Sequence, residues 1–361
     1  MEKKRLSGLD AVRTAAIVFV IIIHSIALSQ VLDGERNVAW HICLYLRQLS
    51  AACVPLFLML SGYLQKGKCF SVSYYCGIIP LYISYFVISA LCVGAYAING
   101  YIGGNMDMTF VTAVYQILNF TANGYSWYFE MFIGLFLLIP LLNMVYTSIA
   151  TKRGKLILIG IFAFLTLMPD TIAGFSPYYD GSGSTVALNI FPDFFKSLYP
   201  VTFYFMGSYI AEFKPHISCL KKVCSVLLAP LISAIIIAAY SHARGGYAWY
   251  VLNGFQTVTV ALVATAVFLA LYDLDVRPAF LEKAVECISK HTFEMYLLSY
   301  LWDNLFYSVL GLGQKLPIVL MMILVLTCSF VSAWLLRLLL TPFSRLVMRP
   351  LGKLLADKEA L

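Results

Sequence analysis

Two ionisable residues, Arg13 and His24, lie in one apolar segment with ten residues between them. At about 100° per residue, the steps from one to the other make about three helical turns, so both side chains fall on the same helix face, ~16 Å apart along the axis. An arginine binds phosphate or carbonyl oxygens, whereas a neutral imidazole accepts a proton from a hydroxyl. The spacing predicts a helix that binds a ligand at one level and moves a proton at another.

The segment that carries both residues, 9–30, is long and apolar enough to span a bilayer. An arginine there can snorkel to the membrane surface, but a histidine at that depth cannot. We therefore interpret His24 as functional; the alternative is a packing residue that has a partner on a neighbouring helix. Asp10 precedes Arg13 by one turn and is expected to orient its guanidinium, or else to be a polar residue at the helix start.

The composition indicates an all-α polytopic integral membrane protein. Of the 361 residues, 61% are hydrophobic and 12% are charged, and no soluble core absorbs so much apolar surface. The formal charge of +7 would also suit nucleic acid, but the Lys and Arg residues cluster in short connections between apolar runs, which is typical of membrane topology. We therefore expect a lipid bilayer and no nucleic acid as partner. The cysteines form no C-x-x-C pair, so neither a disulfide framework nor a metal site is expected.

About ten transmembrane helices are predicted, and residues 1–361 are interpreted as a single transmembrane domain. Basic residues concentrate in alternate connections, which places the N- and C-termini in the cytoplasm. A basic, amphipathic tail, about 341–361, is expected to lie along the inner membrane surface. The predicted spans run approximately over 9–30, 40–64, 76–98, 125–146, 156–174, 197–213, 223–241, 254–272, 288–310 and 316–340.

Some residues within these spans are interpreted as structural. Ser61-Gly62 is expected to allow close helix packing. Pro55 and Pro140 are expected to kink their helices and make room for a cavity. Two long outer connections, 99–124 and 170–196, are rich in Gly, Asn, Asp, Ser and aromatic residues. They are expected either to cap a site with aromatic platforms for sugar rings or to be ordinary interfacial loops.

Four ionisable residues from four predicted helices fall at one level. His24, Arg47, Glu130 and Asp303 are all placed ~8–10 Å below the outer edge of the hydrocarbon, which predicts a shared polar chamber. Glu130 follows Trp127 closely and is a further catalytic candidate. Arg47, Trp127 and Asp303 are candidate substrate-binding residues; the alternative for Arg47 and Asp303 is a structural ion pair or interfacial groups.

The opening element Leu9-Asp10-x-x-Arg13-x10-His24 resembles the signature of the membrane-bound acyltransferase family 3. Other marks of that family follow in the same order, and the resemblance covers essentially the whole chain. They are Val54-Pro55-Leu56-Phe57 through Ser61-Gly62-Tyr63-Leu64, Trp127-Tyr128 with Pro140, Phe205-Met206-Gly207, and Thr292-Phe293-x-x-Tyr296-Leu297-Leu298.

The resemblance implies transfer of an acetyl or similar acyl group from acyl-CoA to a hydroxyl of a cell-surface polysaccharide or lipid-linked glycan, at the plasma membrane. Acetyl-CoA would be a co-substrate, and no metal is expected. His24 would be the general base, and Arg13, oriented by Asp10, would contact the donor. Many members of the family carry a histidine where this chain has Ser299, which leaves the acceptor less defined. The sequence does not give the oligomeric state.

Two other classes of function stay open. A transporter or flippase of a lipid-linked glycan would also have many spans and buried charges. Its sequence indicator would be paired, interrupted helices in two related halves, which we do not find. A sensory or scaffold protein would not need Arg13 and His24 on one face.

Overall fold

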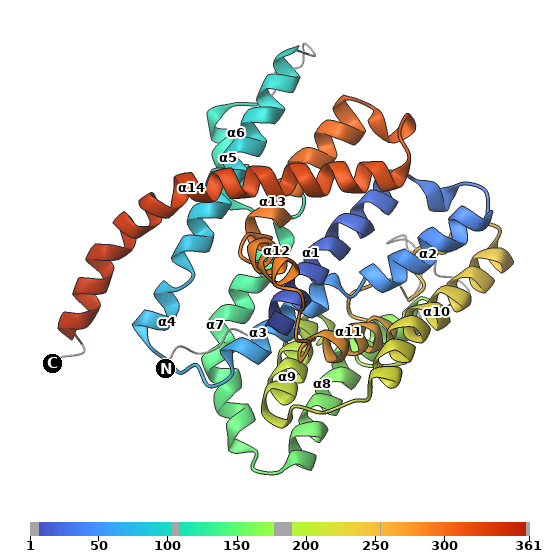
Figure 1. The fold of residues 1–361 in the computed structure, drawn as a ribbon, viewed down its shortest axis with the longest axis horizontal. Coiled ribbons are helices and arrows are strands. Elements are labelled where there is room, and N and C mark those ends of the chain that lie inside the picture. Colours follow the sequence, from blue (N-terminus) through green and yellow to red (C-terminus); the bar gives the residue numbers. More distant parts are fainter. Residues whose placement is uncertain (1–6, 103–107, 177–189, 253, 359–361) are drawn as a thin grey trace. The chain divides into compact units, whose positions relative to one another are not determined.

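The computed structural model describes residues 7–102, 108–176, 190–252 and 254–358 (Figure 1). Helix makes up 78% of the chain and the described ranges contain no strand, which confirms the all-α prediction. The chain divides into two compact units, and each is described by itself. The first unit comprises Met1–Gly67 and Leu142–Lys290, and the second comprises Lys68–Leu141 and His291–Leu361. The prediction of one domain over 1–361 stays a prediction.

The first unit is built from an N-terminal group of helices and a later group. Helix α7 (Trp127–Ser148) contributes its last turns to this unit and the rest to the second. The other elements are α1 (Ser7–Leu28), η1 (Val31–Asp33), α2 (Val38–Ser50), α3 (Cys53–Gln65), α8 (Lys152–Ala173), η2 (Lys196–Leu198), α9 (Tyr199–Phe213), α10 (Cys219–Arg244), α11 (Val258–Leu271) and α12 (Ala279–Ser289).

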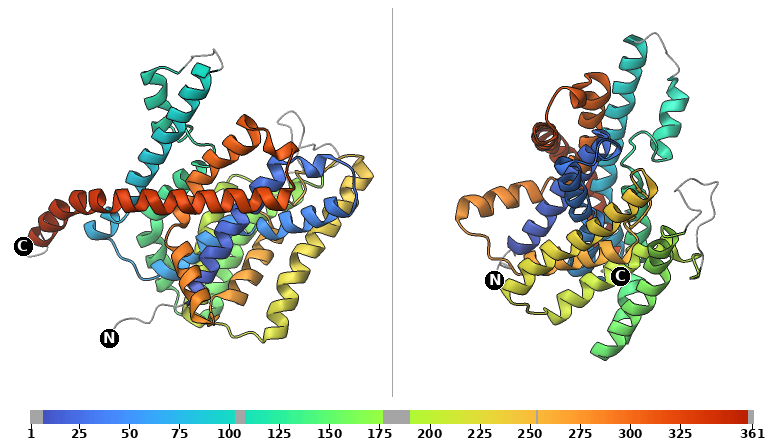
Figure 2. Two further views of the ribbon diagram at one scale, coloured as in Figure 1. Left: turned by 45° about the horizontal axis from the view of Figure 1, so that its top comes forward. Right: turned by 90° about the vertical axis from the view of Figure 1, so that its right-hand side faces the viewer.

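Helix α1 is the centre of the first unit. It packs against α2, α3, α11 and α12, and α2 in turn lies beside α10 (Figures 1 and 2). The start of α1 approaches α11 closely, because a Cβ added at Gly8 would lie 2.5 Å from the carbonyl oxygen of Leu271. On the side of α12, the Thr14 hydroxyl donates to the carbonyl oxygen of Val285 at 3.2 Å. These contacts fix the position of the helix that carries Arg13 and His24.

The second predicted span, 40–64, corresponds to the candidate membrane span Val38–Gln65, in which a two-residue turn at Ala51 and Ala52 separates two helices, α2 and α3. Helix α2 ends at Ser50, and α3 begins at Cys53 with Pro55 in its first turn. A proline has no backbone N–H to donate to the residue four positions earlier, but it is well tolerated in the first turn, where that N–H would have no partner. The irregularity lies at Ala51 and Ala52, just before Pro55, and their backbone stays in the right-handed helical region. The kink expected at Pro55 stays a prediction.

Helices α3 and α9 pack backbone to backbone through two glycines. A Cβ added at Gly62 would lie 1.9 Å from the carbonyl oxygen of Tyr204, and one added at Gly207 would lie 1.9 Å from that of Met59. The Ser208 hydroxyl also donates to the carbonyl oxygen of Gly62 at 3.1 Å. Close packing at Ser61-Gly62 is confirmed, and Gly207 is its counterpart on the facing helix.

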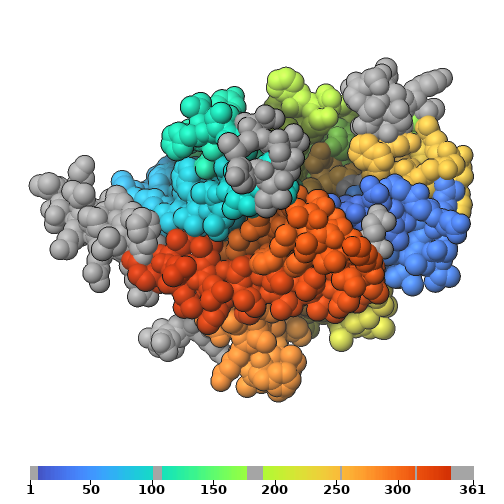
Figure 3. All heavy atoms as spheres, turned by 90° about the horizontal axis from the view of Figure 1, so that it is seen from above, coloured from blue at the N-terminus to red at the C-terminus, as the bar shows by residue number. Residues whose placement is uncertain are grey.

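The second unit is built around the end of the chain. Helix α13 packs against α5 and α14, and Figure 3 shows the surface that α14 presents. The elements of this unit, besides the main part of α7, are α4 (Val72–Cys76), α5 (Ile79–Ile102), α6 (Phe110–Leu118), α13 (Thr292–Asp303), the π-helix η3 (Asn304–Val309), η4 (Leu312–Gln314) and α14 (Ile318–Lys358).

Seven helices in the described part of the chain are long and apolar enough to cross a membrane. The other three predicted spans coincide with shorter helices: α9 has 15 residues, α11 has 14 and α13 has 12. All three are extensively buried by their neighbours. The structure therefore supports a membrane protein but does not fix the number of spans at ten.

Two amphipathic helices were not predicted. The connection 99–124 contains α6, which has nine residues. The segment between α11 and α13 contains α12, and the span predicted over 288–310 therefore begins too early, because α12 runs to Ser289 and α13 starts at Thr292. Neither helix is a continuous apolar run, which is the signal used to find spans.

We predict that Gly62→Ala destabilises the protein by about 3 kcal/mol, because the new methyl group would meet the α9 backbone and force the two helices apart. The apparent melting temperature of the purified protein in detergent would measure this. Gly160→Ala on α8 is the matched control, since a Cβ there meets nothing within 4 Å. Equal melting of the two variants would contradict the close approach.

Candidate active site

Arg13 is paired with a carboxylate of its own helix, and a serine of α12 holds that carboxylate. Its Nη1 lies 3.7 Å from Oδ1 of Asp10, one turn earlier. The same oxygen accepts a hydrogen bond of 2.5 Å from the Ser289 hydroxyl. Asp10 and Ser289 are buried, whereas Arg13 keeps 27% of its side chain exposed. The guanidinium therefore has a fixed anchor and an accessible surface that can meet a ligand.

His24 lies on the same unbroken helix, three turns beyond Arg13 and near the end of α1. Its imidazole is surrounded by protein atoms, yet part of the side chain stays accessible. The positive charge of Arg47 on α2 acts on it electrostatically. His24 is thus a largely enclosed imidazole near a cation, and such an enclosure limits the access of water.

Arg47 also lines a cavity of about 350 Å³ in the first unit. The cavity lies where α8 and α10 end and where α9 and α11 begin, and its other polar and aromatic lining residues are Asp170, Lys196, Trp249, Tyr250 and Thr257. Among the described residues, no hydrogen-bond partner meets the buried Nε of Arg47. The expectation that Arg47 belongs to a polar site is consistent with this position.

The acidic residue of the cavity is already neutralised. Asp170 accepts a hydrogen bond from the Gln256 amide at one carboxylate oxygen, and Nζ of Lys196 lies 3.7 Å from the other. Asp170 and Lys196 were recognised only as the ends of a long outer connection. The sequence did not predict that they line one cavity with Trp249, because the three residues lie on separate elements that come together only in the folded protein.

The remaining predicted site residues lie in the second unit. Trp127 is the first residue of α7, and Glu130 is exposed in its first turn, two residues closer to the helix start than the predicted span implied. Asp303 is buried at the end of α13, where its Oδ2 accepts a hydrogen bond of 2.7 Å from the Tyr125 hydroxyl. The chamber expected to join Glu130 and Asp303 with residues of the first unit stays a prediction.

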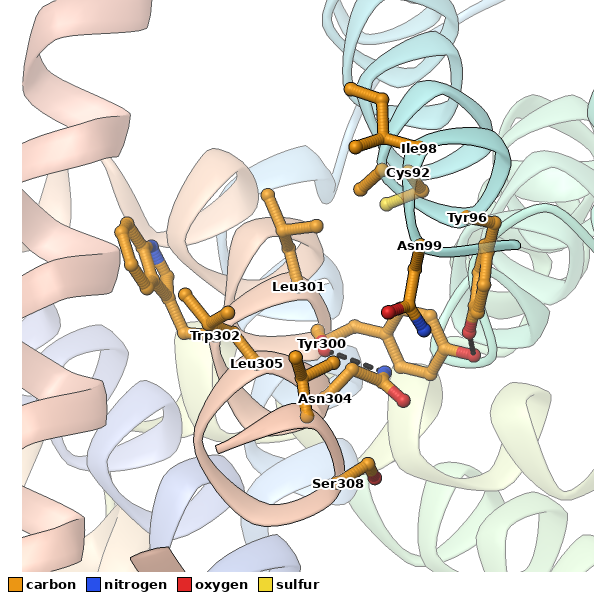
Figure 4. Close-up of a pocket in the computed structure, with 12 residues that line it drawn as sticks. Cys92, Tyr96, Ile98, Asn99, Tyr300, Leu301, Trp302, Asn304, Leu305 and Ser308 are labelled. Carbon is orange, nitrogen blue, oxygen red and sulfur yellow. Dashed lines mark hydrogen bonds between the residues drawn. The ribbon is translucent and has the colours of Figure 1, made fainter. Parts of the chain in front are cut away.

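A second cavity, of about 440 Å³, lies within the second unit between α5 and the α13–η3 segment (Figure 4). Its lining is mainly apolar, and the hydroxyls of Tyr96 and Tyr300 meet at 2.5 Å on one side. The Asn304 amide donates to the carbonyl oxygen of Tyr300 at 2.8 Å. This cavity was not predicted, because its lining residues are ordinary apolar and aromatic members of two predicted spans.

A family model for an acyltransferase domain matches residues 6–338, which is nearly the whole chain. The chain belongs to the acyltransferase 3 family. The resemblance drawn from the Arg13 to His24 element is thereby confirmed, and with it a membrane acyltransferase activity. Neither a curated protein nor a solved structure gave a match. In this family member, Arg13 and His24 lie on one helix, α1, at two different levels.

We predict that Asp10→Asn and Ser289→Ala are coupled, because Ser289 donates to Asp10. In an SDS-unfolding titration, the double variant should lose about 1 kcal/mol less than the sum of the single losses. Ser61→Ala is the matched control, since its hydroxyl donates to the Phe57 carbonyl of its own helix at 2.9 Å. Strict additivity of Asp10→Asn with Ser289→Ala would contradict the observed contact.

Proposed function

We propose that this protein is an O-acyltransferase that moves an acetyl or similar short acyl group from cytoplasmic acyl-CoA to a hydroxyl of a cell-surface polysaccharide or lipid-linked glycan. The observation that carries the proposal is the arrangement on α1, in which Asp10 anchors Arg13 and an enclosed His24 lies three turns farther along. Family membership favours acyl transfer over the transporter or flippase alternative.

The proposed topology has ten spans, with both termini in the cytoplasm of a plasma-membrane protein. The seven long helices would be joined by α9, α11 and α13, whose burial by neighbouring helices lets them cross without a full-length apolar surface of their own. The basic connection at the start of α8 would be cytoplasmic. Arg13 would then lie towards the cytoplasm and His24 towards the outside.

Arg13 and His24 have different roles in the proposed reaction. The separation of ~16 Å along α1 is comparable to an extended pantetheine arm, so the donor nucleotide can stay at the cytoplasmic mouth while its acyl group reaches His24. Arg13 would pair with a donor phosphate or polarise the thioester carbonyl. The basic inner connections are explained by topology alone, so we assign none of their lysines to the donor.

The reaction at His24 is a direct acyl transfer. The imidazole takes the proton of the acceptor hydroxyl, and the oxygen attacks the thioester carbonyl carbon. The tetrahedral intermediate then expels the CoA thiolate, which receives the proton from the imidazolium. Glu130 would assist this chemistry, and Trp127, Arg47 and Asp303 would hold the acceptor.

We predict that His24 and Arg13 variants fail in different ways. His24→Ala should slow the chemical step by about 100-fold while acyl-CoA still binds, because a general base typically contributes that much. Arg13→Ala should weaken donor binding, and Arg13→Lys should restore only part of it, since a point charge does not reproduce the planar fork. Equilibrium binding and single-turnover assays separate the two effects.

The control is His216→Ala, on the connection between α9 and α10. It should leave both the donor affinity and the single-turnover rate unchanged. If the His24→Ala protein turned over as fast as this control, His24 would not be the general base.

A further inference from the structure

The cavity at Arg47 carries an excess of positive charge. Its carboxylate, Asp170, is engaged at both oxygens, by Lys196 and by Gln256. Arg47 therefore supplies a positive charge that Asp170 does not neutralise. In the described ranges, no carboxylate lies within ion-pair distance of Arg47.

An unpaired positive charge is energetically unfavourable at the position of Arg47. The residue lies on α2, within the candidate membrane span Val38–Gln65. A cation within a membrane span requires an anion or a polar cavity, and the buried Nε donor has no acceptor among the described side chains and backbone groups. A guanidinium in this state is suited to a carboxylate or phosphate, both of which it binds through paired N–H groups.

The rest of the lining is suited to a sugar. Trp249 is an exposed residue (52%) and offers the flat apolar face of an aromatic ring. Thr257 and the backbone around Gly254 add polar groups. The volume, about 350 Å³, falls within the range of small-molecule sites.

We propose that this cavity is the acceptor subsite and that it takes a carbohydrate with an anionic group, a carboxylate or a phosphate, which pairs with Arg47. The proposal rests on the proposed function, because that topology puts the ends of α8 and α10 on the outer side, where the acceptor would enter. A bound anion would also offset the repulsion between Arg47 and the imidazolium that forms at His24 during transfer.

The direct test is equilibrium binding of three disaccharides to the full-length protein in nanodiscs at low salt. The probes are digalacturonic acid, its neutral dimethyl ester, and lactose 1-phosphate. We expect the wild type to bind digalacturonic acid about 10-fold more tightly than the ester, since a charge-assisted hydrogen bond contributes about that factor. Tight binding of lactose 1-phosphate without this preference would identify phosphate as the anion.

Variants of Arg47 test whether its charge causes the preference for the acid over the ester. Arg47→Gln should bring the ratio of acid to ester affinity close to one, and Arg47→Lys should retain most of it. Arg36→Gln is the matched control, because Arg36 contacts His242 at 3.4 Å and does not line the cavity. Melting temperatures report whether each variant is folded, and Arg47→Lys keeps the test available if Arg47→Gln does not fold.

Two results would overturn the proposal: equal affinity of the wild type for all three probes, or an anion preference that survives in Arg47→Gln. A separate assay of CoA release from acetyl-CoA tests the proposed function itself. Loss of anion preference with normal, His24-dependent CoA release would refute only the anionic acceptor. Anion preference without CoA release would refute only the acyl transfer.

Discussion

A charge placed inside a bilayer must be paired, and the α1 site is arranged around that requirement. Asp10, one turn before Arg13, supplies the opposite charge, and the Ser289 hydroxyl of α12 donates a hydrogen bond to Asp10. Oδ1 of Asp10 therefore contacts both the Arg13 guanidinium on α1 and the Ser289 hydroxyl on α12. Arg13 keeps 27% of its side chain exposed. If α12 moved away, Asp10 would lose a donor and Arg13 would lose its orientation.

Close helix packing in the first unit also holds α1 in place. Gly62 and Gly207 let α3 and α9 meet at their backbones, and Gly8 lets α1 meet the end of α11. Backbone contacts of this kind leave little freedom for sliding, so the helices around α1 are held in register. Arg47 on α2 lies near His24 and also lines the cavity. The chemistry proposed at His24 and the proposed binding of an acceptor therefore belong to one compact unit.

The sequence was most informative where one helix contains the whole signal. Arg13 and His24 lie on one unbroken helix, so their spacing alone predicted their alignment, and the motifs around them predicted the family. The sequence was least informative where a site is assembled from several elements. Ser289 is an ordinary serine until α12 folds against α1, and Lys196 and Asp170 pair only across a long connection. Pro55 shows a third limit, since a proline predicts an irregular helix but not where the irregularity lies, which here is at Ala51 and Ala52.

The central claim is that donor and acceptor approach α1 from opposite sides of the membrane and meet at His24. Its most direct measurement uses proteoliposomes in which the protein has one known orientation, with radiolabelled acetyl-CoA on one face and a glycan acceptor sealed on the other. The account predicts label on the glycan only when acetyl-CoA is on the face of Arg13, and none with His24→Ala. Transfer from acetyl-CoA on the face of His24, or equal transfer by His24→Ala, would contradict it.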